Sequence, residues 1–161
     1  NTTGAANTAV GRSALLSNTT GNASVATGYS ALLSNTTGNY NTATGQYALE
    51  ANTTAGYNVA VGKSAMLGNT TGQQNVAVGN NSLDANIGGD YNVAVGVSSL
   101  GANTSGDNNT GLGYNTLNAN TTGGNNTAVG RLALDANTTG YGREPIHEIK
   151  HVGLIIHIRI P

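Results

Sequence analysis

The sequence predicts an all-β protein, a parallel β-solenoid (β-roll) in which each turn, here called a coil, is one 17-residue repeat. Three observations predict it: the repeat runs without a gap from residue 1 to 136, Gly supplies 24 of the 161 residues, and short segments alternate medium with small side chains. Self-similarity at a fixed period is the signature of repeat architectures. A helical repeat is excluded because each repeat holds several Gly, Thr and Asn residues, which are poor in helix interiors.

The repeat has the consensus N-T-T-G-x-x-N-T/V-A-V/T-G-x-x-A-L-x-A/S, and its positions are numbered 1 to 17 below. Equivalent residues of stacked coils lie about 4.8 Å apart. Position 1 is always Asn, so we expect a ladder in which each side-chain amide bonds the next, as identical residues do in cross-β stacks. The predicted ladder consists of Asn1, Asn18, Asn35, Asn52, Asn69, Asn86, Asn103 and Asn120.

Position 11 is Gly in every repeat and marks a corner of the coil. Glycine adopts positive φ without the steric cost that other residues meet. We therefore expect the chain to turn with positive φ at each of these residues. The predicted corner glycines are Gly11, Gly28, Gly45, Gly62, Gly79, Gly96, Gly113 and Gly130.

The segment Asn58–Gly62 shows the strand pattern most clearly, because Val and Ala alternate with period 2 between turn residues. The segment around Ser64-Ala65-Met66 predicts a second short strand. Two strands of four or five residues and two turns would then fill one 17-residue coil.

The predicted core is small, because a coil contributes one Leu or Met, two Ala and one or two Val or Thr. Positions 8 and 10 form a second apolar column that one thin chain leaves uncovered. A closed symmetric oligomer would cover it, and we expect a homotrimer or a filament of this chain. The column includes Thr8, Val10, Val59, Val61, Val76, Val78, Val93, Val95, Leu112 and Val129.

Composition excludes several classes of function. Charged residues are 8% of the chain and the formal net charge is −1, so no basic surface for a nucleic acid is expected. No apolar run approaches the roughly 18 residues of a membrane span, so no membrane insertion is expected in this segment. Cys is absent, which excludes a disulfide framework.

After residue 136 the chain begins a partial ninth coil and then changes character, so 1–136 and 137–161 are predicted as separate regions. The tail is a cap, the start of another domain, or a sequence error. It contains His147-Glu148-Ile149-Lys150-His151, which matches the H-E-x-x-H zinc motif, with His157 near the place of a third ligand. Leu154 stands where the extended motif needs Gly, and the flanking run is β-prone rather than helical.

We therefore expect no metal at His147, His151 and His157, with adventitious zinc or nickel binding as the alternative. Asp90 and Asp107 share position 5 in successive coils, but two carboxylates are too few for a Ca²⁺ site. Glu50, Asp84 and Asp135 share position 16 in non-adjacent coils, which does not suit an acid/base pair. We expect neither a cofactor nor enzymatic activity.

The runs Asn7–Gly11, Asn75–Gly79 and Asn126–Gly130 resemble the head repeats of trimeric autotransporter adhesins. The 17-residue form with Asn-Thr-Thr-Gly and Ala-Leu is also similar to repeats of phage-type tail-fibre proteins. The resemblance implies a trimeric β-roll in an extracellular fibre, on a virion or a cell surface.

We therefore expect a structural and adhesive fibre shaft that mediates or spaces attachment to a host or surface. Tyr side chains among Asn, Gln and Ser can stack on and hydrogen-bond host glycans. Two alternatives stay open: an ice-binding solenoid built on the Thr residues of position 2, and a structural extracellular filament without adhesive activity. The candidate glycan contacts are Tyr29, Tyr40, Tyr57, Tyr91 and Tyr114.

Overall fold

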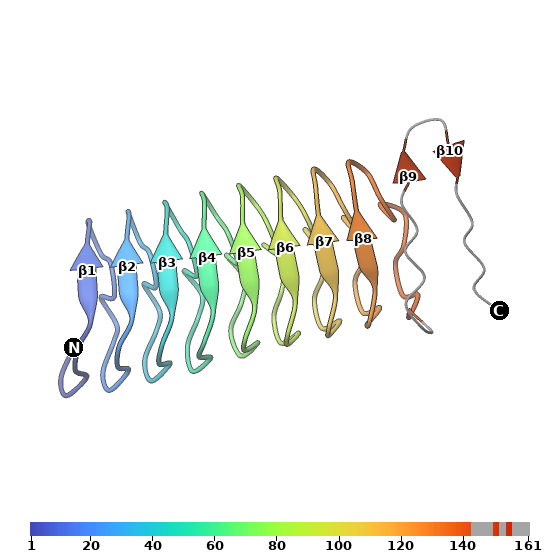
Figure 1. The fold of residues 1–161 in the computed structure, drawn as a ribbon. Coiled ribbons are helices and arrows are strands. Elements are labelled where there is room, and N and C mark those ends of the chain that lie inside the picture. The colour runs from blue at the N-terminus through green and yellow to red at the C-terminus, as the bar shows by residue number, and fades with distance from the viewer. Residues whose placement is uncertain (143–149, 152–153, 156–161) are drawn as a thin grey trace.

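The structure is a computed structural model that describes residues 1–142, 150–151 and 154–155. Eight strands form one sheet in chain order, and every neighbouring pair is parallel (Figure 1). The register never slips: Val59 pairs with Val76, which pairs with Val93, each 17 residues further on. The predicted parallel β-solenoid is thereby confirmed. The strands are β1 (Thr8–Val10), β2 (Val25–Thr27), β3 (Thr42–Thr44), β4 (Val59–Val61), β5 (Val76–Val78), β6 (Val93–Val95), β7 (Thr110–Leu112) and β8 (Thr127–Val129).

Each coil of the solenoid contains one strand, so the second predicted strand around Ser64-Ala65-Met66 is wrong. That segment is a turn in which Ser64 and Met66 have φ of 56° and 51°. The N–H groups of these two left-handed residues bond to opposite neighbouring coils. The Ser64 N–H donates to the Gln46 carbonyl of the preceding coil, and the Met66 N–H donates to the Ser82 carbonyl of the following one. Coils are thus joined here without extended backbone.

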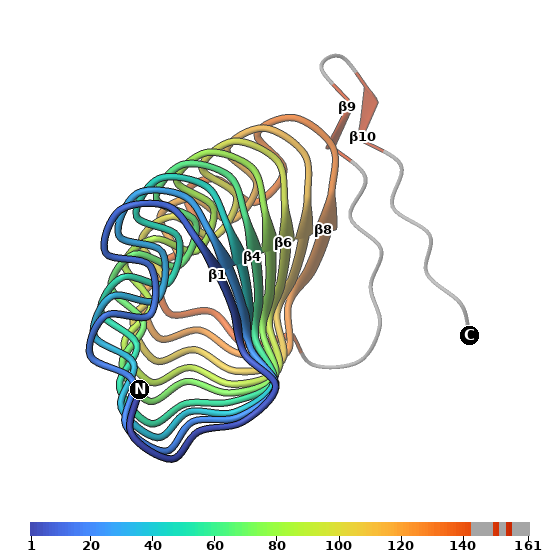
Figure 2. The ribbon, with the colours of Figure 1, turned by 90° about the vertical axis from the view of Figure 1, so that its left-hand side faces the viewer.

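The strands of successive coils lie over one another, and the chain turns at the end of each (Figure 2). The glycine at position 11 directly follows each strand. All eight of these glycines have positive φ, between 122° and 137°. Stacking adds a second constraint, because a Cβ placed on Gly62 would lie 2.5 Å from the carbonyl oxygen of Gly79 in the next coil. Both the backbone conformation and the close approach of the next coil therefore require a residue without a side chain.

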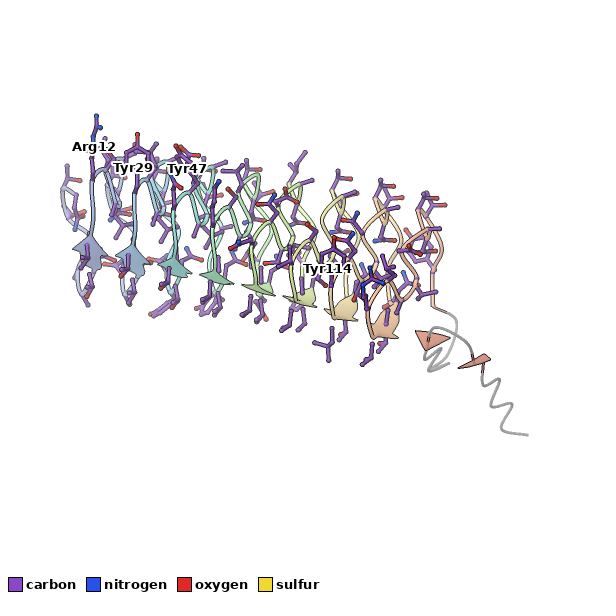
Figure 3. All side chains as sticks on the ribbon, turned by 90° about the horizontal axis from the view of Figure 1, so that it is seen from above. Arg12, Tyr29, Tyr47 and Tyr114 are labelled. Atoms are coloured by element: carbon purple, nitrogen blue, oxygen red, sulfur yellow. The ribbon has the colours of Figure 1, made fainter. Side chains whose placement is uncertain are left out.

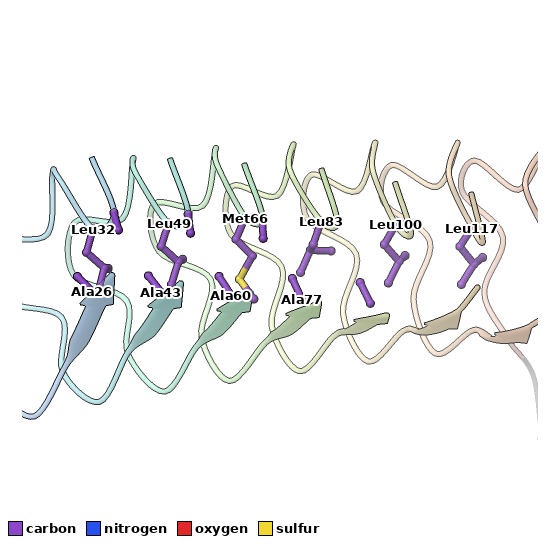
Figure 4. Close-up of a cluster of buried hydrophobic side chains, with 14 of the residues drawn as sticks. Ala26, Leu32, Ala43, Leu49, Ala60, Met66, Ala77, Leu83, Leu100 and Leu117 are labelled. Atoms are coloured by element: carbon purple, nitrogen blue, oxygen red, sulfur yellow. The ribbon is translucent and has the colours of Figure 1, made fainter. Parts of the chain in front are cut away.

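The core is a file of side chains that runs the length of the solenoid (Figure 4). In β2 to β6 and in β8 the Ala at position 9 is buried and meets the Leu or Met at position 15 from the opposite side of the coil. Ala60, Met66 and Leu83 are fully buried. Two coils depart from this pattern. Ala9 in the first coil is exposed. In β7, Gly111 replaces the Ala, and the Ser99 hydroxyl of the preceding coil donates to its carbonyl at 3.0 Å.

Beyond the repeats the structure describes an antiparallel pair, β9 (Lys150–His151) and β10 (Leu154–Ile155). His147 and His157 lie outside the described residues. His151 belongs to β9, which is a strand, whereas a zinc-protease motif requires a helix at this place. Within the described part of the chain, no helix has the length and apolar character needed to cross a membrane.

The buried file of position-15 side chains should contribute strongly to stability, which is the first prediction. Leu83→Ala removes a fully buried side chain from the file, and the loss of burial together with the remaining cavity lowers the free energy of unfolding by about 2–5 kcal/mol. Urea denaturation followed by circular dichroism measures it. The control is Leu16→Ala, whose side chain is 65% exposed and whose replacement changes stability by less than about 0.5 kcal/mol. Equal effects of the two substitutions would contradict this core.

Candidate functional site

The Asn residues of position 1 form a continuous ladder inside the solenoid. From Asn18 to Asn137, each Nδ2 donates to the Oδ1 of the Asn in the preceding coil, at distances between 2.8 and 3.3 Å. The same Nδ2 donates to the carbonyl at position 4 of its own coil, as Asn69 does to Gly72 at 2.9 Å. The side chains of this ladder are fully buried from Asn35 to Asn120. Their role in the described coils is structural.

The Asn residues of position 7 form a second ladder, which we did not predict from the sequence. The Oδ1 of Asn58 accepts the backbone N–H of Asn75 in the next coil at 2.9 Å. Its Nδ2 donates to the Gly72 carbonyl at 2.9 Å, which is the same acceptor that Asn69 uses. The position-4 carbonyl therefore accepts one hydrogen bond from each ladder and connects the two. The recurrence of Asn at position 7 in seven of eight repeats was the available signal.

Ser24 is the one residue that replaces Asn at position 7, and its hydroxyl takes over the acceptor role. Its Oγ accepts the N–H of Asn41 at 3.2 Å and donates to the carbonyl of Asn22. A shorter side chain thus keeps the link to the next coil but loses the contact with the position-4 carbonyl. Ser24 therefore preserves one of the two hydrogen bonds by which position 7 joins its coil to the next.

The carboxylates of position 5 cap backbone groups. Asp107 accepts the N–H of Asp90 at 2.8 Å, and Asp90 accepts the N–H of Gln73 at 2.7 Å. Asn22 and Asn39 serve the same purpose in earlier coils. A carboxylate at this position can therefore be exchanged for an amide without loss of the hydrogen bond.

At position 16 the carboxylates of Glu50, Asp84 and Asp135 are all partly buried. Burial raises the pKa of the Asp84 carboxyl above its ordinary value, although hydrogen bonds from the backbone N–H groups of Asp84 and Ala85 act in the opposite direction. A raised pKa in the folded state means that this group favours folding less as the pH rises from its unfolded-state pKa to its folded-state pKa. Within the described residues, no group of three or more His, Cys, Asp or Glu is placed to hold a metal ion.

The Thr residues of position 2 use their hydroxyl hydrogens within the solenoid. Thr19 donates its Oγ1 hydrogen to the Thr36 carbonyl at 2.9 Å, and the pattern repeats along the file. Ile87 replaces Thr in the middle of the file. The surface of this file therefore presents methyl groups and hydroxyl lone pairs. An ice-binding role for it stays an alternative prediction, which thermal hysteresis measures directly.

The outer face of the sheet carries the side chains of positions 8 and 10, because residues two apart on a strand share a face. All sixteen are Val, Thr or Leu. Several are well exposed, with Val10 at 57% and Val61 at 37% of their surface. This outer strand face extends over all eight strands and carries no charged residue, and exposed apolar side chains gathered on one face are typical of an interaction surface.

The five candidate Tyr contacts are exposed and fall into two columns. Tyr40, Tyr57 and Tyr91 occupy position 6, whereas Tyr29 and Tyr114 occupy position 12. The rings of Tyr40 and Tyr57 stack at 4.9 Å between centroids. Tyr29 meets Tyr47 of the next coil edge-on at 5.4 Å (Figure 3). The structure thus groups some of these rings into pairs, which enlarge the aromatic surface that a ligand can contact.

The position-1 ladder generates the second prediction. Asn69→Asp places a carboxylate oxygen against the Asn52 Oδ1 and the Gly72 carbonyl, where the amide donated at 3.1 and 2.9 Å. A buried, unpaired charge costs about 3–5 kcal/mol. Because the buried carboxyl then has a raised pKa, the loss of stability shrinks as the pH is lowered.

Urea unfolding at neutral and acidic pH measures the effect of Asn69→Asp. The control is Asn80→Asp, since Asn80 is exposed and its Oδ1 only accepts the Lys63 N–H. That variant keeps its acceptor and changes stability by less than about 0.5 kcal/mol. Wild-type stability in Asn69→Asp at neutral pH would show that the ladder is not formed.

Comparison with known proteins finds no relative of this chain. The chain matches no family model, no curated protein and no solved structure. The resemblance of its repeats to adhesin heads and tail fibres therefore stays an expectation.

Proposed function

We propose that this chain is the shaft of an attachment fibre, a structural and adhesive element that spaces or presents a binding tip outside a virion or a cell. The observation that supports this most is the unbroken register of eight parallel strands, which repeats the same outer surface from coil to coil. Such a stack supplies length, stiffness and a repeated surface. Those are the properties that a spacer or a multivalent adhesive shaft needs.

Assembly of the shaft follows from the outer strand face. Its Val, Thr and Leu side chains expose apolar area that association removes from water. The face carries no charge to oppose association, and its periodicity matches that of another copy of the same chain. We infer a homotrimer in which this face of each chain turns toward the common axis, as closed symmetry satisfies every copy equally.

The assembly is tested by placing charge on the outer strand face. The double substitution Val61→Asp and Val78→Asp puts two carboxylates into the proposed contact, and we expect the trimer to dissociate because neither charge can be solvated there. Light scattering at micromolar concentration gives the oligomeric state. The matched control is Thr37→Asp with Thr54→Asp, which places the same charges in successive coils at exposed turn positions.

The control variant should remain trimeric. A stable, folded monomer of the wild-type chain would contradict the assembly, and so would an intact trimer in the Val61→Asp, Val78→Asp variant.

The adhesive half of the proposal rests on the exposed Tyr side chains. An aromatic ring offers an apolar face for a sugar ring and a hydroxyl for its polar edge. A single contact is weak, but rings repeated along the shaft and across three chains raise the avidity by about 10²–10⁴. Glycan contacts of this kind would have low affinity at each coil and would be spread over the shaft.

Adhesion is tested by binding of the whole assembled chain to a glycan array. The triple substitution Tyr40→Ala, Tyr57→Ala and Tyr91→Ala removes the position-6 rings and should reduce the retained glycans, because avidity falls with each lost contact. Gln74→Ala, in the same exposed column, is the control and should bind as the wild type does. An assembled wild-type chain that retains no glycan would contradict adhesion and leave a shaft that only spaces.

A further inference from the structure

The charges of the solenoid are sorted by column. Within residues 1–142, the three basic side chains, Arg12, Lys63 and Arg131, all occupy position 12. The acidic side chains occupy positions 5 and 16, and positions 8 to 14 of the eight coils contain no Asp or Glu. The side chains of position 12 in successive coils, from Arg12 to Arg131, are called the position-12 edge. This edge is cationic although the chain as a whole has a formal net charge of −1.

Aromatic rings accompany the two arginines of this edge. The guanidinium of Arg12 lies 5.7 Å from the ring centroid of Tyr29 in the next coil. At the far end the guanidinium of Arg131 lies 5.6 Å from the ring of Tyr114. Tyr47 packs edge-on against Tyr29, and Figure 3 shows Arg12, Tyr29 and Tyr47 projecting side by side. An Arg held over a Tyr keeps its N–H groups at the rim of the ring, available to an anion.

We propose that the position-12 edge binds an acidic polysaccharide, a polymer of uronic acid sugars laid along the solenoid. Guanidinium groups bind carboxylates through paired, charge-assisted hydrogen bonds. The neighbouring Tyr rings offer stacking surfaces for sugar rings, and the exposed Gln46 between Tyr29 and Lys63 offers an amide to sugar hydroxyls. This inference rests on the proposed adhesive function and names its ligand class.

The spacing of the cations favours a polymer over a single sugar. Arg12 and Lys63 are three coils apart, about 14 Å, and Lys63 and Arg131 are four coils apart, about 19 Å. One extended chain can reach all three, and each contact raises the local concentration for the next. A nucleic acid fits less well, because duplex DNA carries one charge per about 1.7 Å and its binding proteins neutralise many phosphates at once.

Binding of the whole chain to polygalacturonate tests this inference, with the fully methyl-esterified polymer as the uncharged ligand and a mixed-sequence single-stranded RNA as the other polyanion. Calorimetry or surface plasmon resonance gives the affinities. We expect binding to polygalacturonate that weakens with salt, and much weaker binding to the ester and to RNA. The triple variant Arg12→Gln, Lys63→Gln and Arg131→Gln should bind polygalacturonate about tenfold more weakly or worse.

The matched control is Thr20→Asp with Thr54→Asp and Thr122→Asp, which lowers the net charge by the same three units at exposed position-3 residues away from the edge. It should retain most of the affinity. Equal loss in both triple variants, undiminished binding by the edge variant, or equal affinity for the ester or RNA would each overturn the inference. If the chain binds other glycans on an array but not polygalacturonate, this inference fails and the adhesive function stands. Failure on every glycan removes both.

Discussion

The hydrogen bond from one asparagine amide to the next, repeated once per coil, is the interaction on which the rest of this structure depends. Between Asn35 and Asn120 these amides are fully buried, and a buried amide without partners would destabilise the fold strongly. Each amide finds its partners in its own coil and in its neighbour. In the described part of the chain, no buried side-chain nitrogen or oxygen lacks a hydrogen bond. A slip of one residue between coils would break every link in both ladders, so the polar interior specifies the register.

The regular spacing of the surface side chains follows from the register that the buried ladders fix. Because the coils cannot slip, residues at the same position of successive coils form straight files. Neighbours within a file lie about one strand spacing apart. The uncharged strand face, the Tyr pairs and the position-12 edge all arise in this way. Function is then a matter of which residues occupy the outward positions. The repeat tolerates Arg, Tyr, Gln, Lys and Val at position 12, whereas it keeps Asn at position 1 in every coil.

Most of the architecture could be predicted from the sequence, because the period, the invariant glycines and the Val-Ala-Val segments each point to the same stacked strands. The second strand at Ser64-Ala65-Met66 could not be excluded, since nothing in these residue types signals positive φ at Ser64 and Met66. The position-7 ladder required knowledge of where Gly72 and Asn58 meet across coils. The burial that raises the pKa of Asp84 likewise depends on packing around position 16, which the repeat pattern does not encode.

The most direct test of the central claim is hydrogen exchange of the asparagine side-chain amides, followed by NMR. The ladder predicts that the Nδ2 hydrogens of Asn52, Asn69 and Asn86 exchange only when coils open, about a thousandfold or more slower than those of the exposed Asn108 and Asn125. Slow exchange confined to the position-1 and position-7 amides would support the account. Exchange of the Asn69 amide as fast as that of Asn108 would contradict it.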